Sequence, residues 1–123
     1  MATDTQGNIY YSNQSFSPIT GMAVRKFSAG SWSDLTPATT SIVNYQALAA
    51  SSNNTLFAYG SDGAGTVRRY NNGAWEQLGN AGFAGGATFA EMKVSSDNYV
   101  YTCQVASGSV SVYRISVNAS STD

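Results

Sequence analysis

The stretch Thr66–Gly79, TVRRYNNGAWEQLG, decides the fold of this chain. It predicts a strand that ends at Tyr70, a tight turn over residues 71–73, and a second strand that opens at Trp75. Asn-Gly between two β-rich runs is the strongest short-range signal of a hairpin, because a type I′ turn needs positive φ at both central residues. We therefore expect an antiparallel strand pair here.

The same unit occurs earlier as Ala23–Leu35, AVRKFSAGSWSDL, with matching residues 43 positions before their counterparts. A further step of 43 reaches residues 110–113, VSVY, a third copy that keeps the first strand and lacks the Gly-x-Trp hairpin. A fixed period of this length predicts a repeat architecture. We expect a single domain, 1–123, made of the repeats 1–43, 44–86 and 87–123.

Each repeat predicts four short antiparallel strands, in the order strand, turn, strand, loop, strand, hairpin, strand. Four strands in a period of about 43 residues are typical of a β-propeller blade. No stretch has the 3.6-residue periodicity of an amphipathic helix. The predicted fold class is therefore all-β, a β-propeller with three four-stranded blade-like repeats per chain.

The number of blades predicts a partner. A closed propeller usually has about four or more blades, so three blades leave apolar faces open at both ends of the arc. The third repeat also lacks the outer strand that carries a Trp in the first two. We expect self-association, most simply a homodimer that closes a six-bladed ring. A compact three-blade monomer is the alternative.

Charge and composition exclude several classes of function. Only 11% of the 123 residues are charged and the net charge is −1, so the clustered basic footprint of a nucleic-acid-binding protein is missing. The sequence has no apolar run that could span a bilayer and no secretory signal, which predicts no membrane insertion and either a cytoplasmic location or export by a non-classical route. Histidine is absent and Cys103 is the single cysteine. We therefore expect no enzyme activity, metal or cofactor.

Two tryptophans hold the same place in two repeats and are the leading candidates for ligand contact. A Trp at a blade rim offers a flat apolar face to the C–H face of a sugar and an indole N–H to donate. An Arg precedes each Trp by seven residues. The guanidinium of an Arg beside aromatic rings can donate two hydrogen bonds to vicinal hydroxyls of a sugar. The predicted ligand-binding residues are Trp32, Trp75, Arg25, Arg68, Tyr70 and Glu76.

A packing role is the alternative for the same residues. In this interpretation each Trp closes a blade edge, and Arg25 and Arg68 make cation–π braces against the aromatic rings. Strand alternation puts each Arg on the same face as the aromatic residue two positions later, which fits both roles. Glu76 and Glu91 do not predict a glycosidase pair, because the repeats do not bring the two carboxylates together at a defined separation.

The segment 47–79, ALAASSNNTLFAYGSDGAGTVRRYNNGAWEQLG, runs from small residues through an apolar–aromatic strand, a Gly tip and a polar strand to a Gly-x-Trp turn. In this order of segments the chain resembles the fungal fucose-specific lectin family and its short bacterial relatives. The resemblance implies a six-bladed propeller assembled from short chains, and sugar binding. The sugar-binding Arg and Glu of the family are not matched. Their positions hold Tyr10, Phe57 and Val100 in the second strands, and Lys26, Arg69 and Val112 in the third strands.

The first functional hypothesis is a non-catalytic, multivalent carbohydrate-binding protein, a lectin. Its ligands would be glycans held at blade rims or between blades, and oligomerisation would multiply the sites into avidity. The alternative is a structural or adhesive subunit of a larger extracellular or viral assembly that has no small ligand. In that case the bare end blades serve assembly and the tryptophans pack.

Overall fold

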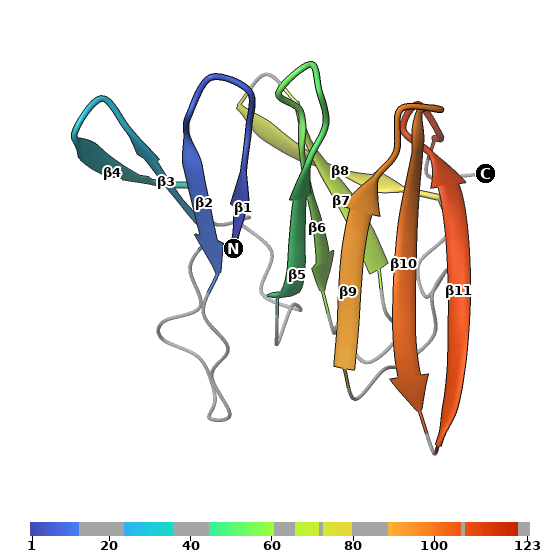
Figure 1. Cartoon of the computed structure of the whole chain (residues 1–123). Coiled ribbons are helices and arrows are strands. Elements are labelled where there is room, and N and C mark those ends of the chain that lie inside the picture. The colour runs from blue at the N-terminus through green and yellow to red at the C-terminus, as the bar shows by residue number, and fades with distance from the viewer. Residues whose placement is uncertain are drawn as a thin grey trace.

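The described part of the chain folds into β-strands and turns without a helix, which confirms the predicted all-β class. The structure is a computed structural model, and it describes residues 1–12, 24–35, 45–60, 66–71, 73–79, 89–106 and 108–120. Its strands form three separate antiparallel sheets that lie side by side in chain order, each built from consecutive strands (Figure 1). The predicted repeat boundaries, after residues 43 and 86, lie outside the described residues.

Sheets I and II have four strands each in the same order, and sheet III has three described strands. Sheet I comprises β1 (Ala2–Thr3), β2 (Ile9–Ser12), β3 (Val24–Ser28) and β4 (Ser31–Asp34). Sheet II comprises β5 (Tyr45–Ala50), β6 (Leu56–Gly60), β7 (Thr66–Asn71) and β8 (Ala74–Leu78). Sheet III comprises β9 (Phe89–Val94), β10 (Tyr99–Ala106) and β11 (Ser109–Ser116). A fourth strand beside β11, expected for a four-stranded blade, is not found in the described residues.

The outer hairpins of sheets I and II form because their turn residues accept positive φ. In sheet I the two-residue turn Ala29–Gly30 has φ values of 50° and 83°. These are the two positive values that a type I′ turn needs. In sheet II Gly73 has a φ of 87°, and its neighbour at position 72 lies outside the described residues. The strand pairs expected from the two Gly-x-Trp segments are therefore confirmed.

Sheet III corrects the step of 43 residues for the third repeat. In sheet II Leu56 lies opposite Tyr70, whereas in sheet III the corresponding Val100 lies opposite Ile115. The step between these third strands is 115 − 70 = 45, so Ile115, and not Tyr113, takes the place of Tyr70. One residue of this shift is already present at β10, because the step from Leu56 to Val100 is 44. The second arises within the β10–β11 hairpin, where Val100 and Ile115 are 15 positions apart, whereas Leu56 and Tyr70 are 14 apart. On the third strand the shift of two residues leaves the same side chains on the same face. On the second strand the shift of one residue reverses the face, so Tyr101, and not Val100, takes the place of Phe57.

Face-to-face packing of neighbouring sheets buries the apolar side chains at two seams. Every residue of β6 is buried, because sheet II is covered on both faces. Alternation along β6 sends Leu56 and Ala58 to the seam with sheet I, and Phe57 and Tyr59 to the seam with sheet III. Each large apolar side chain that is fully buried in this way stabilises the fold by about 1.5–3 kcal/mol.

The two faces of each sheet are named here by their neighbours. The forward face is turned to the next sheet in chain order, and the rear face to the preceding one. The seam between sheets I and II holds Tyr10, Val24, Leu48, Leu56 and Ala58. The seam between sheets II and III holds Ala49, Phe57, Tyr59, Val67, Leu78, Met92, Val100, Ile115 and Ala119. The first strands lie on one side of the arrangement, where β5 contacts both β1 and β9 (Figure 1).

Candidate functional site

Trp75 lies at the seam between sheets I and II and is committed to packing there. It is half-buried and packs against the apolar cluster of that seam. Its ring meets Tyr70 edge-on, with centroids 5.3 Å apart and an interplanar angle of 61°. Its indole N–H donates a hydrogen bond to the backbone carbonyl of Leu35 in sheet I. Both the apolar ring and the polar N–H, the two features that a sugar would use, therefore meet protein groups.

Trp32 holds the same place in sheet I, but its surroundings are open. It is 54% exposed and lies on the rear face of sheet I, which no described sheet covers. Its ring contacts Phe27 on the neighbouring strand, with centroids 5.2 Å apart and a tilt of 52°. Two equivalent sequence positions therefore have different environments, because Trp75 has a preceding sheet to pack against and Trp32 has none within the described chain.

The two predicted arginines share the face of the tryptophans. Arg25 is exposed and lies opposite Asp34 across β3 and β4, next to the Phe27–Trp32 pair. Arg68 is half-buried and lies between Ala58 and Gln77 in the register of sheet II. Alternation places each Arg on the same face as the aromatic residue two positions later, as the sequence predicted, and this is the rear face of its sheet.

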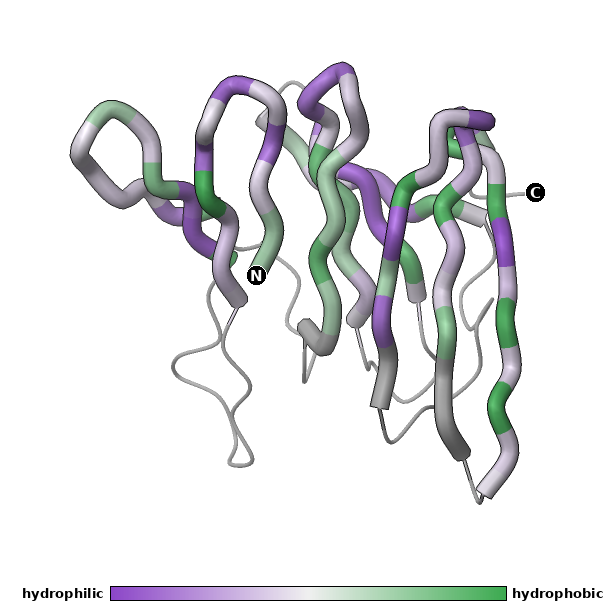
Figure 2. The backbone as a smooth tube through the Cα atoms, viewed as in Figure 1, coloured by the Kyte–Doolittle hydropathy of each residue, from purple (hydrophilic) through white to green (hydrophobic). Residues whose placement is uncertain are grey.

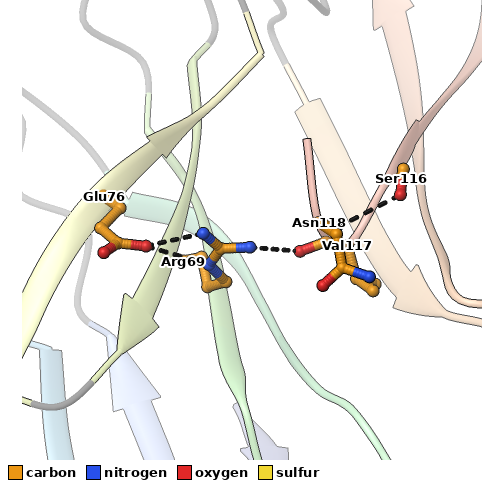
Figure 3. A network of polar contacts seen from close by, with 5 residues as sticks. All are labelled: Arg69, Glu76, Ser116, Val117 and Asn118. Atoms are coloured by element: carbon orange, nitrogen blue, oxygen red, sulfur yellow. Dashed lines mark hydrogen bonds and ion pairs between the residues drawn. The ribbon is translucent and has the colours of Figure 1, made fainter. Parts of the chain in front are cut away.

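Glu76 lies on the opposite face of sheet II from Trp75 and Tyr70. Its carboxylate accepts hydrogen bonds from Nε and Nη2 of Arg69 at 3.2 and 2.7 Å (Figure 3). The third contact of the guanidinium, from Nη1, goes to the backbone carbonyl of Val117 in sheet III at 2.6 Å. The hydrogen bond from Arg69 lowers the pKa of the Glu76 carboxyl below its usual value. Arg69 therefore links sheets II and III, and Glu76 orients it.

The six predicted ligand residues do not form one pocket. Arg68, Tyr70 and Trp75 gather on the rear face of sheet II, where the Tyr70–Trp75 contact closes the seam. Arg25 and Trp32 gather on the rear face of sheet I. Glu76 belongs to the other seam, a placement that strand alternation already implies because it directly follows Trp75 in the sequence.

Two aspartate–tyrosine braces were not singled out from the sequence. Asp4 accepts hydrogen bonds from the backbone N–H groups of Gln6 and Asn8, from the Asn8 side chain, and from the Tyr10 hydroxyl at 2.8 Å. Burial raises the pKa of Asp4, but these hydrogen bonds outweigh it, so the pKa is lowered overall. Burial, with the hydrogen bond and charge of Asp4, raises the pKa of Tyr10 to about 12.

The second brace holds the corresponding turn of sheet III. The Tyr101 hydroxyl donates to Asp97 at 2.9 Å, and this hydrogen bond lowers the pKa of the Asp97 carboxyl. The signal for both braces was an Asp in the turn before an aromatic strand residue. Each brace fixes the phenol ring of a second-strand tyrosine, so the two rings have similar positions in their sheets.

An open hollow of about 310 Å³ lies along the first strands of the three sheets. Lys93 on β9 brings a charged side chain to a wall that is otherwise made of small and apolar residues. A single ammonium group on an open, apolar wall does not define a ligand. The lining residues are Met1, Ala2, Thr3, Leu48, Ala49, Ala50, Met92, Lys93 and Val94.

Among the described residues, no three His, Cys, Asp or Glu side chains gather closely enough to hold a metal ion. The same residues include no apolar helix of membrane-spanning length. Comparison with known protein families finds no matching family model, and comparison with curated proteins finds no match either.

Proposed function

We propose that the chain is a non-catalytic structural module, three blades of a β-propeller, that acts as a subunit of a larger assembly. Three antiparallel sheets in chain order, packed face to face with their first strands on one side, support the propeller. A propeller ring needs about four or more blades, so a three-blade unit requires further blades beyond its two outer faces.

The contact between Trp75 and Leu35 carries this proposal. A buried indole N–H normally has a hydrogen-bond partner, and here that partner is a backbone carbonyl of the preceding sheet. The Gly-x-Trp hairpin thus has a use inside the protein, which is to fasten one sheet to the sheet before it. The equivalent hairpin in sheet I leaves Trp32 exposed. We infer that Trp32 packs against a sheet contributed by another subunit of the assembly and so fastens sheet I to that sheet.

Carbohydrate binding at the rear face of sheet I is the second candidate function. The exposure of Trp32, together with Arg25 and Asp34 on the same face, favours it. An exposed indole stacked on Phe27 is a rigid platform for the C–H face of a sugar, and the neighbouring charges offer polar contacts to its hydroxyls.

Titration of tryptophan fluorescence with simple sugars, followed by a glycan array, separates the two functions. The structural module predicts no sugar-dependent change in emission and no array signal. The lectin predicts a saturable change that is lost in Trp32→Phe and kept in the matched variant Trp75→Phe, because only the Trp32 ring is open to solvent. A saturable, Trp32-dependent change would overturn the structural-module proposal.

A further inference from the structure

The outer faces of the arrangement repeat the residues that fill the inner seams. On the forward faces, the cross-strand register pairs a second-strand aromatic residue with a third-strand cation in every sheet. Tyr10 and Phe57 of sheets I and II are buried, each against the following sheet. Tyr101, their counterpart in sheet III, is half-exposed because no described sheet follows. The three pairs are Tyr10 with Lys26, Phe57 with Arg69, and Tyr101 with Arg114.

The valine two residues before each cation shows the same difference in burial between the inner seams and sheet III, and here the difference is larger. Val24 and Val67 are each 0% exposed in their seams. Val112 holds the equivalent position in sheet III and is 65% exposed. Apolar and polar residues alternate along β11, as Figure 2 shows, although β11 lies at the open end of the arrangement. Alternation of apolar and polar residues is the pattern of a strand that has one face covered.

The rear face of sheet I shows the complementary pattern. Its residues correspond to Leu56, Ala58, Tyr70 and Trp75, which sheet II buries wholly or partly against sheet I. On sheet I the equivalent positions hold Ile9, Tyr11, Phe27 and Trp32. In the described chain the exposed large apolar residues are Tyr11 and Trp32 on this face, Val110 and Val112 on the forward face of sheet III, and the first residue, Met1.

We propose that the forward face of sheet III docks on the rear face of sheet I of a second copy of this chain. The inference rests on the proposed structural function and names its partner. The observation that selects a second copy is continuity with the two seams. Over the three strands that sheet III shares with the other sheets, each open face is the repeat-equivalent of a face already packed against its complement within the chain. The contact joins different faces, so it is head-to-tail, and a ring of two copies contains it twice.

Arg114 supplies a polar contact for this docking. At the inner seam, Arg69 reaches the carbonyl of Val117, the residue that directly follows the third strand of sheet III. Arg114 holds the equivalent position on sheet III, and the residue that directly follows the third strand of sheet I is Ala29. We therefore expect Arg114 to donate to the Ala29 carbonyl of the second copy.

Molar mass from light scattering tests the proposal. The expected mass is about twice the 12.9 kDa of the single chain. Val112→Glu places a charge in the contact without disturbing a buried site, and should raise the dissociation constant at least tenfold, about 1.4 kcal/mol. Ser109→Glu, an exposed position on the same strand but the other face, is the matched control and should leave the mass unchanged. An assembly that is insensitive to Val112→Glu would overturn the proposal.

Mixing two variants tests the head-to-tail geometry. Val112→Glu damages only the forward face, and Trp32→Ser damages only the rear face. Each variant alone should lose the doubled mass, whereas an equimolar mixture should regain it, because one intact seam can form between the two. A mixture that stays at the mass of the separate variants would overturn head-to-tail docking.

The thiol of Cys103 gives an independent measure of the same contact. It is half-exposed and lies opposite Val112 on the forward face of sheet III. Its alkylation by iodoacetamide should slow as protein concentration rises in the wild type, but not in Val112→Glu. A monomeric wild type with concentration-independent alkylation would refute self-docking. If that monomer also binds no sugar, the structural function stands with a different partner, so the two proposals fail separately.

Discussion

The packing of sheet II on sheet III can be tested at Gly79, where substitution by alanine adds a single methyl group. Its φ is +70°, and a Cβ added there overlaps the Cδ1 atom of Ile115, with Cγ1 of the same side chain 3.7 Å away. The left-handed conformation costs an L-residue about 1–2 kcal/mol, and overpacking a filled seam costs about 1–3 kcal/mol. Gly79→Ala should therefore lower the free energy of unfolding by about 2–5 kcal/mol.

Gly73→Ala is the matched control, because it isolates the backbone cost. Gly73 has a φ of +87°, and among the described residues other than its chain neighbours none has an atom within 4 Å of an added Cβ. This variant should lose only about 1–2 kcal/mol. The difference between the two alanine variants, about 1–3 kcal/mol, measures the overlap with Ile115.

A second substitution tests whether the overlap comes from the Cδ1 atom of Ile115. Ile115→Val removes Cδ1, and by itself should cost about 0.5–1.5 kcal/mol. In the Gly79→Ala background it removes the clash, so the double variant should be more stable than the sum of the single changes by about 1–3 kcal/mol. Urea denaturation followed by circular dichroism gives the four free energies of unfolding. The reasoning is refuted if Gly79→Ala costs no more than Gly73→Ala, or if Ile115→Val gives no recovery.

Three further predictions address single contacts. Trp75→Phe keeps an aromatic ring but leaves the Leu35 carbonyl without its indole donor, so urea denaturation should show a loss of about 1–2 kcal/mol; an unchanged midpoint would contradict the fastening role. The pKa of Asp4 is lowered by its hydrogen bonds, so its stabilising contribution is present above the usual value of 3.8 and is lost as pH falls through the lowered pKa. Thermal melts below pH 4 should therefore show a steeper loss of Tm in the wild type than in Asp4→Asn, and parallel curves would argue against the brace. Thr102 is buried with no partner for its hydroxyl among the described residues, so the isosteric Thr102→Val should raise the free energy of unfolding by about 1 kcal/mol in the same urea assay; a loss of stability would reveal a partner for the hydroxyl.

Much of the secondary structure could be predicted because its causes are local. Glycines at the turns permit positive φ, and alternating or continuous apolar runs define strands, so the chain forms consecutive short antiparallel strands as the sequence predicted. The two-residue strand β1 was not predicted, because Ala2–Thr3 has no periodicity of its own and pairs only with β2. In the third repeat the second strand was aligned one residue off and the third strand two, because register depends on the lengths of the segments that join the strands rather than on residue identity.

The grouping of the candidate residues on the faces of the sheets was predicted in part. Strand alternation correctly grouped Arg25 with Phe27, and Arg68 with Tyr70, because that geometry is a property of a single strand. The pairing of Glu76 with Arg69 is local, because the two residues lie opposite each other on the same face of the β7–β8 hairpin. The hydrogen bond from Arg69 to the Val117 carbonyl joins two repeats, and the sequence contained no signal for it. Which repeat lies against which is a long-range fact, and a single sequence contains no direct signal for it.

The sequence by itself determined that this chain is an all-β repeat with two Gly-x-Trp hairpins, because turn chemistry and strand period act over a few residues. Only the tertiary structure decided what the two tryptophans do. They occupy equivalent positions, yet Trp75 donates its N–H to Leu35 while Trp32 is open to solvent. The physical reason is that burial depends on the neighbouring sheet, and sheet II has a sheet before it whereas sheet I, in the described chain, does not.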